Sequence, residues 1–128
     1  MRTFFAGLTA AAFVFALGAP ASAKVETVKG KLIDQACYKM DKANTGQKHQ
    51  MRSGEQEDCA TACAKMGRPV ALLTDDGKVY QVTGDLAAEK NAKLVAHMTH
   101  TVELTGDVTT DPDGTMKIAA TNLKMISR

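Results

Sequence analysis

The stretch TVELTGDVT at residues 101–109 alternates between apolar and polar side chains. Val102, Leu104 and Val108 fall on one side, and the polar residues between them fall on the other. Successive side chains of a β-strand point to opposite faces, so this period of two predicts a strand with one buried face.

Further strands are predicted on both sides of this stretch. The sequence DPDG at 111–114 is typical of a turn, and the apolar residues in 116–120 alternate in a last strand with an irregular continuation at 123–126. Upstream, two short apolar runs at 70–74 and 79–82 flank the turn sequence DDG, which predicts a β-hairpin. Four of the expected strands follow from these patterns.

The remaining elements are a first strand and two helices. Residues 24–34 are rich in β-branched side chains and predict a strand with a bulge or bend at Gly30. The sequence SGEQ has the pattern of a capping box and predicts a helix over 53–67, which ends at Gly67 because a proline follows soon after. A second helix is expected within 86–98, after Asp85 as its cap.

The resulting order is strand, helix, strand, strand, helix, strand, strand. Five strands with a helix between the third and fourth are the connectivity of the OB-fold, a small Greek-key barrel. We therefore expect one mainly β, OB-like domain over 24–128, with an exposed loop at 40–52 and the cysteine-bearing helix inserted between strands 1 and 2. The alternative fold is an α+β meander.

The first 23 residues have the pattern of a secretory signal peptide. Arg2 precedes an apolar stretch at 4–17, and the small residues that follow end in an A-x-A cleavage site at Ala23. The apolar stretch is shorter than the ~18–20 residues that a membrane-spanning helix needs. We expect cleavage after Ala23, a periplasmic or secreted location, and no stable membrane insertion of the mature chain.

Composition argues against nucleic acid as a partner. The whole chain has 16 Lys and Arg against 14 Asp and Glu, and Arg2 is the only charged residue of the predicted signal peptide. All the phenylalanines lie in that signal peptide, so Tyr38 and Tyr80 are the only aromatic residues of the mature chain. Nucleic-acid binding normally needs a basic excess and stacking side chains, which are nearly absent here.

The chain resembles a group of small exported bacterial proteins of unassigned function. The resemblance covers most of the mature chain and rests on GKLID at 30–34, CY at 37–38, CATACAKMGRP at 59–69 and LLTDDGKVY at 72–80. It implies an OB-like β-barrel outside the cytoplasm, and it implies no catalytic residues.

The three cysteines, Cys37, Cys59 and Cys63, are the main candidates for function. An oxidising compartment normally pairs cysteines, so one hypothesis is a structural disulfide from Cys37 to Cys59 or Cys63, with the third thiol left over. A disulfide between Cys59 and Cys63 is the less favoured pairing.

A second hypothesis is a thiolate metal site. Cys59 and Cys63 share one helical face, Cys37 ends the first strand, and His49 in the exposed loop is the expected fourth ligand. Three sulfurs and an imidazole suit Cu(I) or Zn(II), and the thioether of Met66 or Met51 would favour copper.

The third hypothesis is thiol–disulfide redox chemistry, in which Cys59 or Cys63 is a reactive thiolate. Glu57 and Asp58 oppose the formation of a thiolate at Cys59, which we expect in the second turn of its helix. No hydrolase motif is present. The favoured interpretation is an exported, non-enzymatic small domain with a three-cysteine site that is either metal-binding or disulfide-bonded.

Overall fold

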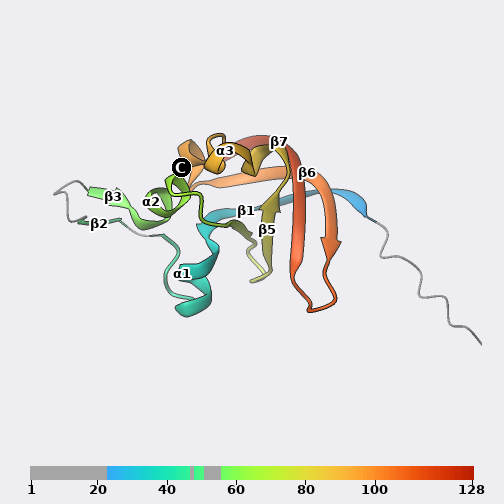
Figure 1. Ribbon diagram of the computed structural model, residues 1–128, viewed down its shortest axis with the longest axis horizontal. Coiled ribbons are helices and arrows are strands. Elements are labelled where there is room, and N and C mark those ends of the chain that lie inside the picture. Colours follow the sequence, from blue (N-terminus) through green and yellow to red (C-terminus); the bar gives the residue numbers. More distant parts are fainter. Residues whose placement is uncertain (1–22, 47, 51–55) are drawn as a thin grey trace, which may run out of the picture.

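The computed structural model describes residues 23–46, 48–50 and 56–128, and its main feature is a closed β-barrel (Figure 1). The barrel consists of β1 (Lys24–Asp34), β4 (Val70–Leu73), β5 (Val79–Thr83), β6 (Thr101–Thr110) and β7 (Met116–Ser127). The strand order is β1-β4-β5-β7-β6, with β5 and β7 parallel and the other neighbours antiparallel. This is the OB-like barrel expected from the sequence. The alternative prediction of an α+β meander is wrong, because β5 pairs with β7 and not with the next strand along the chain, β6.

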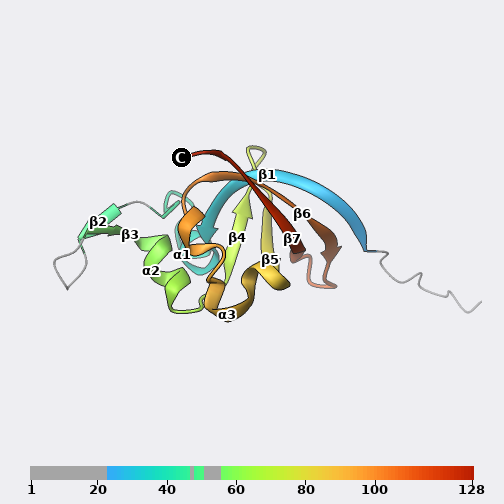
Figure 2. The same ribbon diagram turned by 90° about the horizontal axis from the view of Figure 1, so that it is seen from above.

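β1 closes the barrel because it pairs with two strands in succession. Its residues Lys24–Lys31 pair with β6, and Lys31–Asp34 pair with β4, along a strongly curved path (Figure 2). Gly30 lies next to the residue at which the partner changes. A Cβ atom added there would lie 2.8 Å from the carbonyl carbon of Leu73 and closer still to its oxygen. The glycine expected to mark a bulge or bend thus marks the change of partner.

The pairing of β6 with β7 explains the irregular end of the last strand. A register shift leaves Thr121 without a partner in β6. Before the shift, Ile118 and Ala120 are buried, whereas after it Leu123 and Met125 are the residues packed against the core. The extra residue therefore moves the inward-facing set from even to odd positions.

The core combines the inner face of the barrel with two segments that cover it. Apolar side chains of all five barrel strands are buried. Ala60 and Ala64 of the helix α2 (Cys59–Lys65) pack against them, together with Leu86, Leu94 and Met98 from the segment between β5 and β6. The cysteine-bearing helix is thus part of the core and not an appendage.

The prediction of a single helix within 86–98 is wrong. The structure has three short pieces there instead: η1 (Asp85–Ala87), α3 (Ala88–Asn91) and η2 (Val95–His97). Three consecutive residues of α3 have positive φ angles, of 52°, 55° and 61°, which a regular right-handed helix does not allow. The last of them, Asn91, is buried and donates hydrogen bonds to the carbonyls of Ala64 and Arg68, so it satisfies backbone groups at the end of α2.

The insertion between β1 and β4 contains more structure than expected. It consists of α1 (Gln35–Met40), β2 (Lys48–Gln50), β3 (Gln56–Asp58) and α2, all at one end of the barrel (Figure 1). β2 lies within the predicted exposed loop at 40–52 and pairs with β3. Gly46 of the same loop is buried, and a Cβ there would contact Thr99 at 3.1 Å. The loop is therefore only partly exposed.

The helix predicted over 53–67 has the expected end but not the expected start. α2 begins at Cys59, because residues 56–58 form the strand β3, and residues 53–55 of the predicted capping box lie outside the described residues. At the other end, Gly67 has a φ of 81° and follows the helix, as expected for a left-handed cap before a proline.

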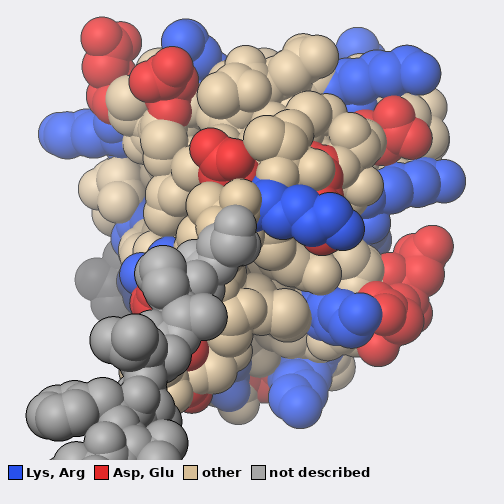
Figure 3. Space-filling model, turned by 90° about the vertical axis from the view of Figure 1, so that its right-hand side faces the viewer, with Lys and Arg blue, Asp and Glu red and all other residues tan. Residues whose placement is uncertain are grey.

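The predicted signal peptide is not described, apart from Ala23 at its end. Within the described part of the chain, no helix is both long and apolar enough to cross a membrane. The face of the molecule shown in Figure 3 carries acidic and basic side chains side by side. This face has no continuous basic patch.

We predict that Gly30→Ala destabilises the protein by about 2 kcal/mol, because the added methyl group overlaps the backbone of β4. Gly77→Ala is the control: its Cβ meets nothing within 4 Å, and its cost is the backbone strain of a positive φ, about 1 kcal/mol. Urea unfolding midpoints of both variants measure the difference. A Gly30→Ala midpoint equal to that of the unmodified protein would contradict the close approach.

Candidate functional site

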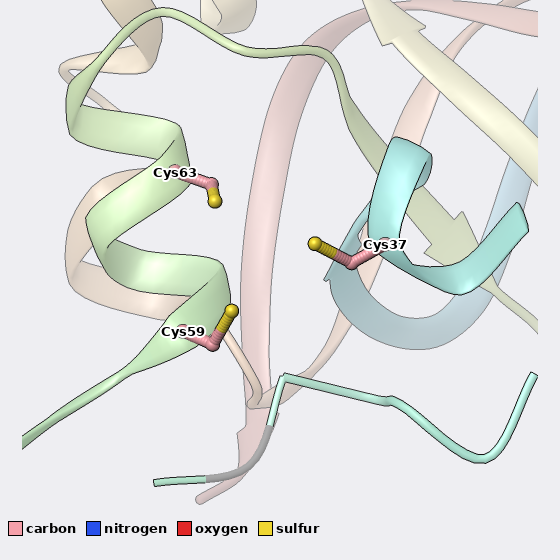
Figure 4. A group of neighbouring side chains, drawn as sticks. All are labelled: Cys37, Cys59 and Cys63. Carbon is pink, nitrogen blue, oxygen red and sulfur yellow. The ribbon is translucent and has the colours of Figure 1, made fainter. Parts of the chain in front are cut away.

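The three cysteines converge at the end of the barrel where the inserted elements lie. Cys37 belongs to α1, and Cys59 and Cys63 lie four residues apart on one face of α2. Their Sγ atoms all lie within 4.8 Å of one another, and the side chains point toward one another (Figure 4). The predicted convergence of these residues on one site is confirmed.

Two local placements differ from the sequence-based prediction. Cys37 was expected at the end of the first strand, but it lies in the short helix α1, which Asp34 begins. Cys59 was expected in the second helical turn, but it is the first residue of α2 because residues 56–58 pair as a strand. In both cases the pairing of the preceding strand decides where the helix starts: β1 pairs with β4 before α1, and β3 pairs with β2 before α2.

α1 is held in place by contacts at its first residues. The Cys37 amide donates a hydrogen bond of 2.7 Å to Oδ1 of Asp34, which is the N-cap of this helix. The Gln35 amide donates to the carbonyl of Pro69, at 3.1 Å, in the segment that follows α2. These contacts fasten α1 to the end of β1 and to the chain leaving α2, so the two cysteine-bearing helices keep a defined relation.

Asp34 is a residue of the site that the sequence interpretation missed. It is 3% exposed, and its Oδ2 has no hydrogen-bond partner among the described residues. The nearest cation is Arg68, whose Nε lies 3.9 Å from this oxygen. The sequence does contain a signal for this role, because Asp34 stands at the end of a predicted strand and three residues before Cys37. An N-cap side chain typically accepts a hydrogen bond from the backbone amide two or three residues after it.

The environment keeps the three thiols protonated. Burial raises the pKa of Cys37, Cys59 and Cys63 above the ordinary value. The Asp34 carboxylate raises the pKa of Cys37 and Cys63 further, whereas Arg68 lowers that of Cys63. All three cysteines are free. Cys59 thus gains no net acidity from its place at the start of a short helix.

Of the other predicted ligands, Met66 alone has its side chain among the described residues. The backbone of His49 pairs with Glu57 in the two-stranded sheet, and its side chain lies outside the described residues, as does all of Met51. Met66 follows the last residue of α2 and is 65% exposed. The roles of His49 and Met66 stay predictions.

A second pair of potential ligands lies at the end of η2 and just after it. The rings of His97 and His100 meet edge to face with centroids 6.5 Å apart, and both Nδ1 atoms are buried with no hydrogen-bond partner in the part of the chain that the structure describes. Burial lowers the pKa of His100, so its neutral form is favoured. Within the described part of the chain, the three cysteines remain the one group of at least three His, Cys, Asp or Glu side chains arranged to hold an ion.

No protein family, curated protein or solved structure matches the chain. The chemistry of the site is therefore inferred from its own residues. Three thiols that lie this close together can bind one thiophilic metal ion. Alternatively, a pair of them can form a disulfide.

We predict slow alkylation of the reduced, metal-free protein by iodoacetamide at pH 7.5. Because burial raises all three thiol pKa values, the thiolate fraction should increase only as the pH passes well beyond the ordinary cysteine value of about 8.5. The same protein unfolded in urea is the control and should react faster at the same pH of 7.5. A cysteine that reacts rapidly at pH 7 in the folded protein would contradict the prediction.

Proposed function

We propose that Cys37, Cys59 and Cys63 bind one thiophilic metal ion, Cu(I) or Zn(II), as thiolates in a small exported protein without catalytic activity. The observation that carries the proposal is the convergence of three Sγ atoms within 4.8 Å. They come from two helices that are separated in the sequence by a two-stranded sheet, β2 and β3.

The spacing of the sulfur atoms supports one shared ion. Metal–sulfur bonds of about 2.3 Å in a trigonal or tetrahedral centre hold the sulfurs roughly 3.8–4.0 Å apart. The observed upper limit of 4.8 Å therefore requires only a small contraction. A disulfide needs two sulfurs about 2.05 Å apart and leaves the third thiol without a role.

The protonated state of the thiols favours metal binding over redox catalysis. A redox-active cysteine needs a thiolate at neutral pH, which a lowered pKa supplies. Here burial raises the pKa of each thiol. A bound cation displaces the thiol protons and supplies the positive charge that these buried thiolates lack.

A structural disulfide between Cys37 and Cys59 or Cys63 is the second candidate function, because the same convergence brings these pairs within reach of each other. Export, which we propose from the signal peptide pattern at residues 1–23, would expose the thiols to oxidation. A bound metal ion would then protect the thiols from pairing.

We predict that the reduced protein, prepared anaerobically, binds one Zn(II) or Cu(I) ion per chain. Cys37→Ser, Cys59→Ser and Cys63→Ser should each weaken binding by more than about 100-fold, since loss of a residue that only supports a ligand already costs 10–100-fold. Chelator competition measures the affinities, with Thr61→Ser on α2 as the matched control. His49→Ala tests the fourth ligand. Unchanged stoichiometry and affinity in Cys63→Ser would refute the site.

We also predict that exported protein begins at Lys24 and carries three alkylatable thiols after denaturation and metal removal. Intact-mass measurement before and after alkylation checks both points. A mass that retains residues 1–23 would contradict the export proposal. A single alkylated cysteine would instead show that two of the three form the structural disulfide.

A further inference from the structure

A buried carboxylate, that of Asp34, lies beside the three-cysteine site in addition to its sulfur ligands. We propose that the Asp34 carboxylate shifts the relative affinity of this site toward a divalent ion such as Zn(II) and away from a monovalent ion such as Cu(I). This inference rests on the proposed function, because it presupposes that the cysteines bind a metal ion.

The geometry leaves the charge of Asp34 only partly compensated. Oδ1 accepts the amide of Cys37 at 2.7 Å, but Oδ2 is buried without a hydrogen-bond partner among the described residues. The Nε atom of Arg68 is 3.9 Å away, beyond hydrogen-bond distance, and this side chain is 44% exposed to solvent. A nearly buried carboxylate with one distant counter-ion exerts a strong field on its surroundings.

The field of Asp34 reaches the sulfur atoms. The hydrogen bond of 2.7 Å between Oδ1 and the Cys37 amide places the carboxylate beside the first of the three cysteines, and its charge adds to burial in raising the pKa of each thiol. Its oxygens do not belong to the group of atoms that lie within 4.8 Å of one another. We therefore assign Asp34 an electrostatic role beside the ligands and not a place among them.

Charge balance decides which ion this arrangement favours. Once the three thiols have lost their protons to a bound ion, they contribute a charge of about −3, and the charges of Asp34 and Arg68 cancel each other in the sum. A divalent ion reduces this to about −1, and a monovalent ion only to about −2, so the divalent complex retains less uncompensated buried charge. The attraction between Asp34 and the ion is also twice as large for the divalent ion, because Coulomb energy is proportional to charge.

The variant Asp34→Asn isolates this charge. An asparagine oxygen can still accept the amide of Cys37, so the cap of α1 is retained while the charge is removed. Zn(II) and Cu(I) displace the same thiol protons, so any change in thiol acidity cancels in the ratio of their affinities. The ratio therefore reports the electrostatic contribution alone.

The experiment is chelator competition with Zn(II) and with Cu(I) on the full reduced chain, under anaerobic conditions. Loss of a residue that supports a ligand typically weakens metal affinity by about 10–100-fold, and we take this range for Zn(II) in Asp34→Asn. The free-energy cost for Cu(I) is half as large, because its charge is half as large, so its affinity should weaken by about 3–10-fold. We expect Asp34→Asn to shift the Zn(II)/Cu(I) affinity ratio toward Cu(I) by about 3–10-fold. Arg68→Gln removes the opposing charge and should shift the ratio toward Zn(II).

Asp58→Asn is the matched control. Asp58 precedes Cys59, but its Oδ2 accepts a hydrogen bond from the hydroxyl of Thr99 at 3.0 Å, and its charge is not one of those that raise the pKa of the three thiols. The Zn(II)/Cu(I) affinity ratio of Asp58→Asn should equal that of the unmodified protein. A shift as large as that of Asp34→Asn would overturn the specific role of Asp34.

Two further outcomes are decisive and distinguishable. Equal weakening of both ions in Asp34→Asn would mean that Asp34 acts only through structure, and would overturn this inference while the proposed function stands. Binding of neither ion by the unmodified protein would overturn the proposed function itself, and this inference with it. If Asp34→Asn does not fold, a ratio unchanged in Arg68→Gln overturns the inference independently.

Discussion

The double pairing of β1 is the constraint on which the rest of the structure depends. β1 leaves β6 and joins β4 at Lys31, so one strand supplies both partners that close the barrel. Closure satisfies the backbone groups of edges that would otherwise be exposed. It also delivers Asp34 to the end of the barrel at which α2 and the segment after it return, and this places the two cysteine-bearing helices next to each other.

The site owes its geometry to the attachment of both helices to the barrel. α1 is fastened through the hydrogen bond between Gln35 and Pro69, and α2 through the burial of Ala60 and Ala64 in the core. The chain between the two helices can vary in path at little entropic cost, because the cost of closing a loop grows slowly with its length. The thiols are therefore positioned by rigid elements, which is the condition for a defined ligand set.

Asp34 combines a structural and an electrostatic role at the same position. As the N-cap it starts α1, and as a buried carboxylate paired only with Arg68 at 3.9 Å it adds to the effect of burial in raising the pKa of Cys37 and Cys63. Burial of an incompletely paired charge costs stability. Proteins that are otherwise locally consistent tolerate such costs mainly at functional sites, so the position of Asp34 is itself an argument that the cysteine cluster has a function.

The sequence by itself determined the barrel strands, the β4–β5 hairpin and the end of α2 at Gly67, because alternation and turn residues act over a few neighbouring positions. It also named the three cysteines, but only the tertiary structure brought them within 4.8 Å of one another. The broken segment at 86–98 and the role of Asp34 were likewise decided by long-range contacts. The start of α2 at Cys59 follows from the pairing of β3 with β2 and not from the predicted capping box, because a helix of seven residues is too short to be stable alone.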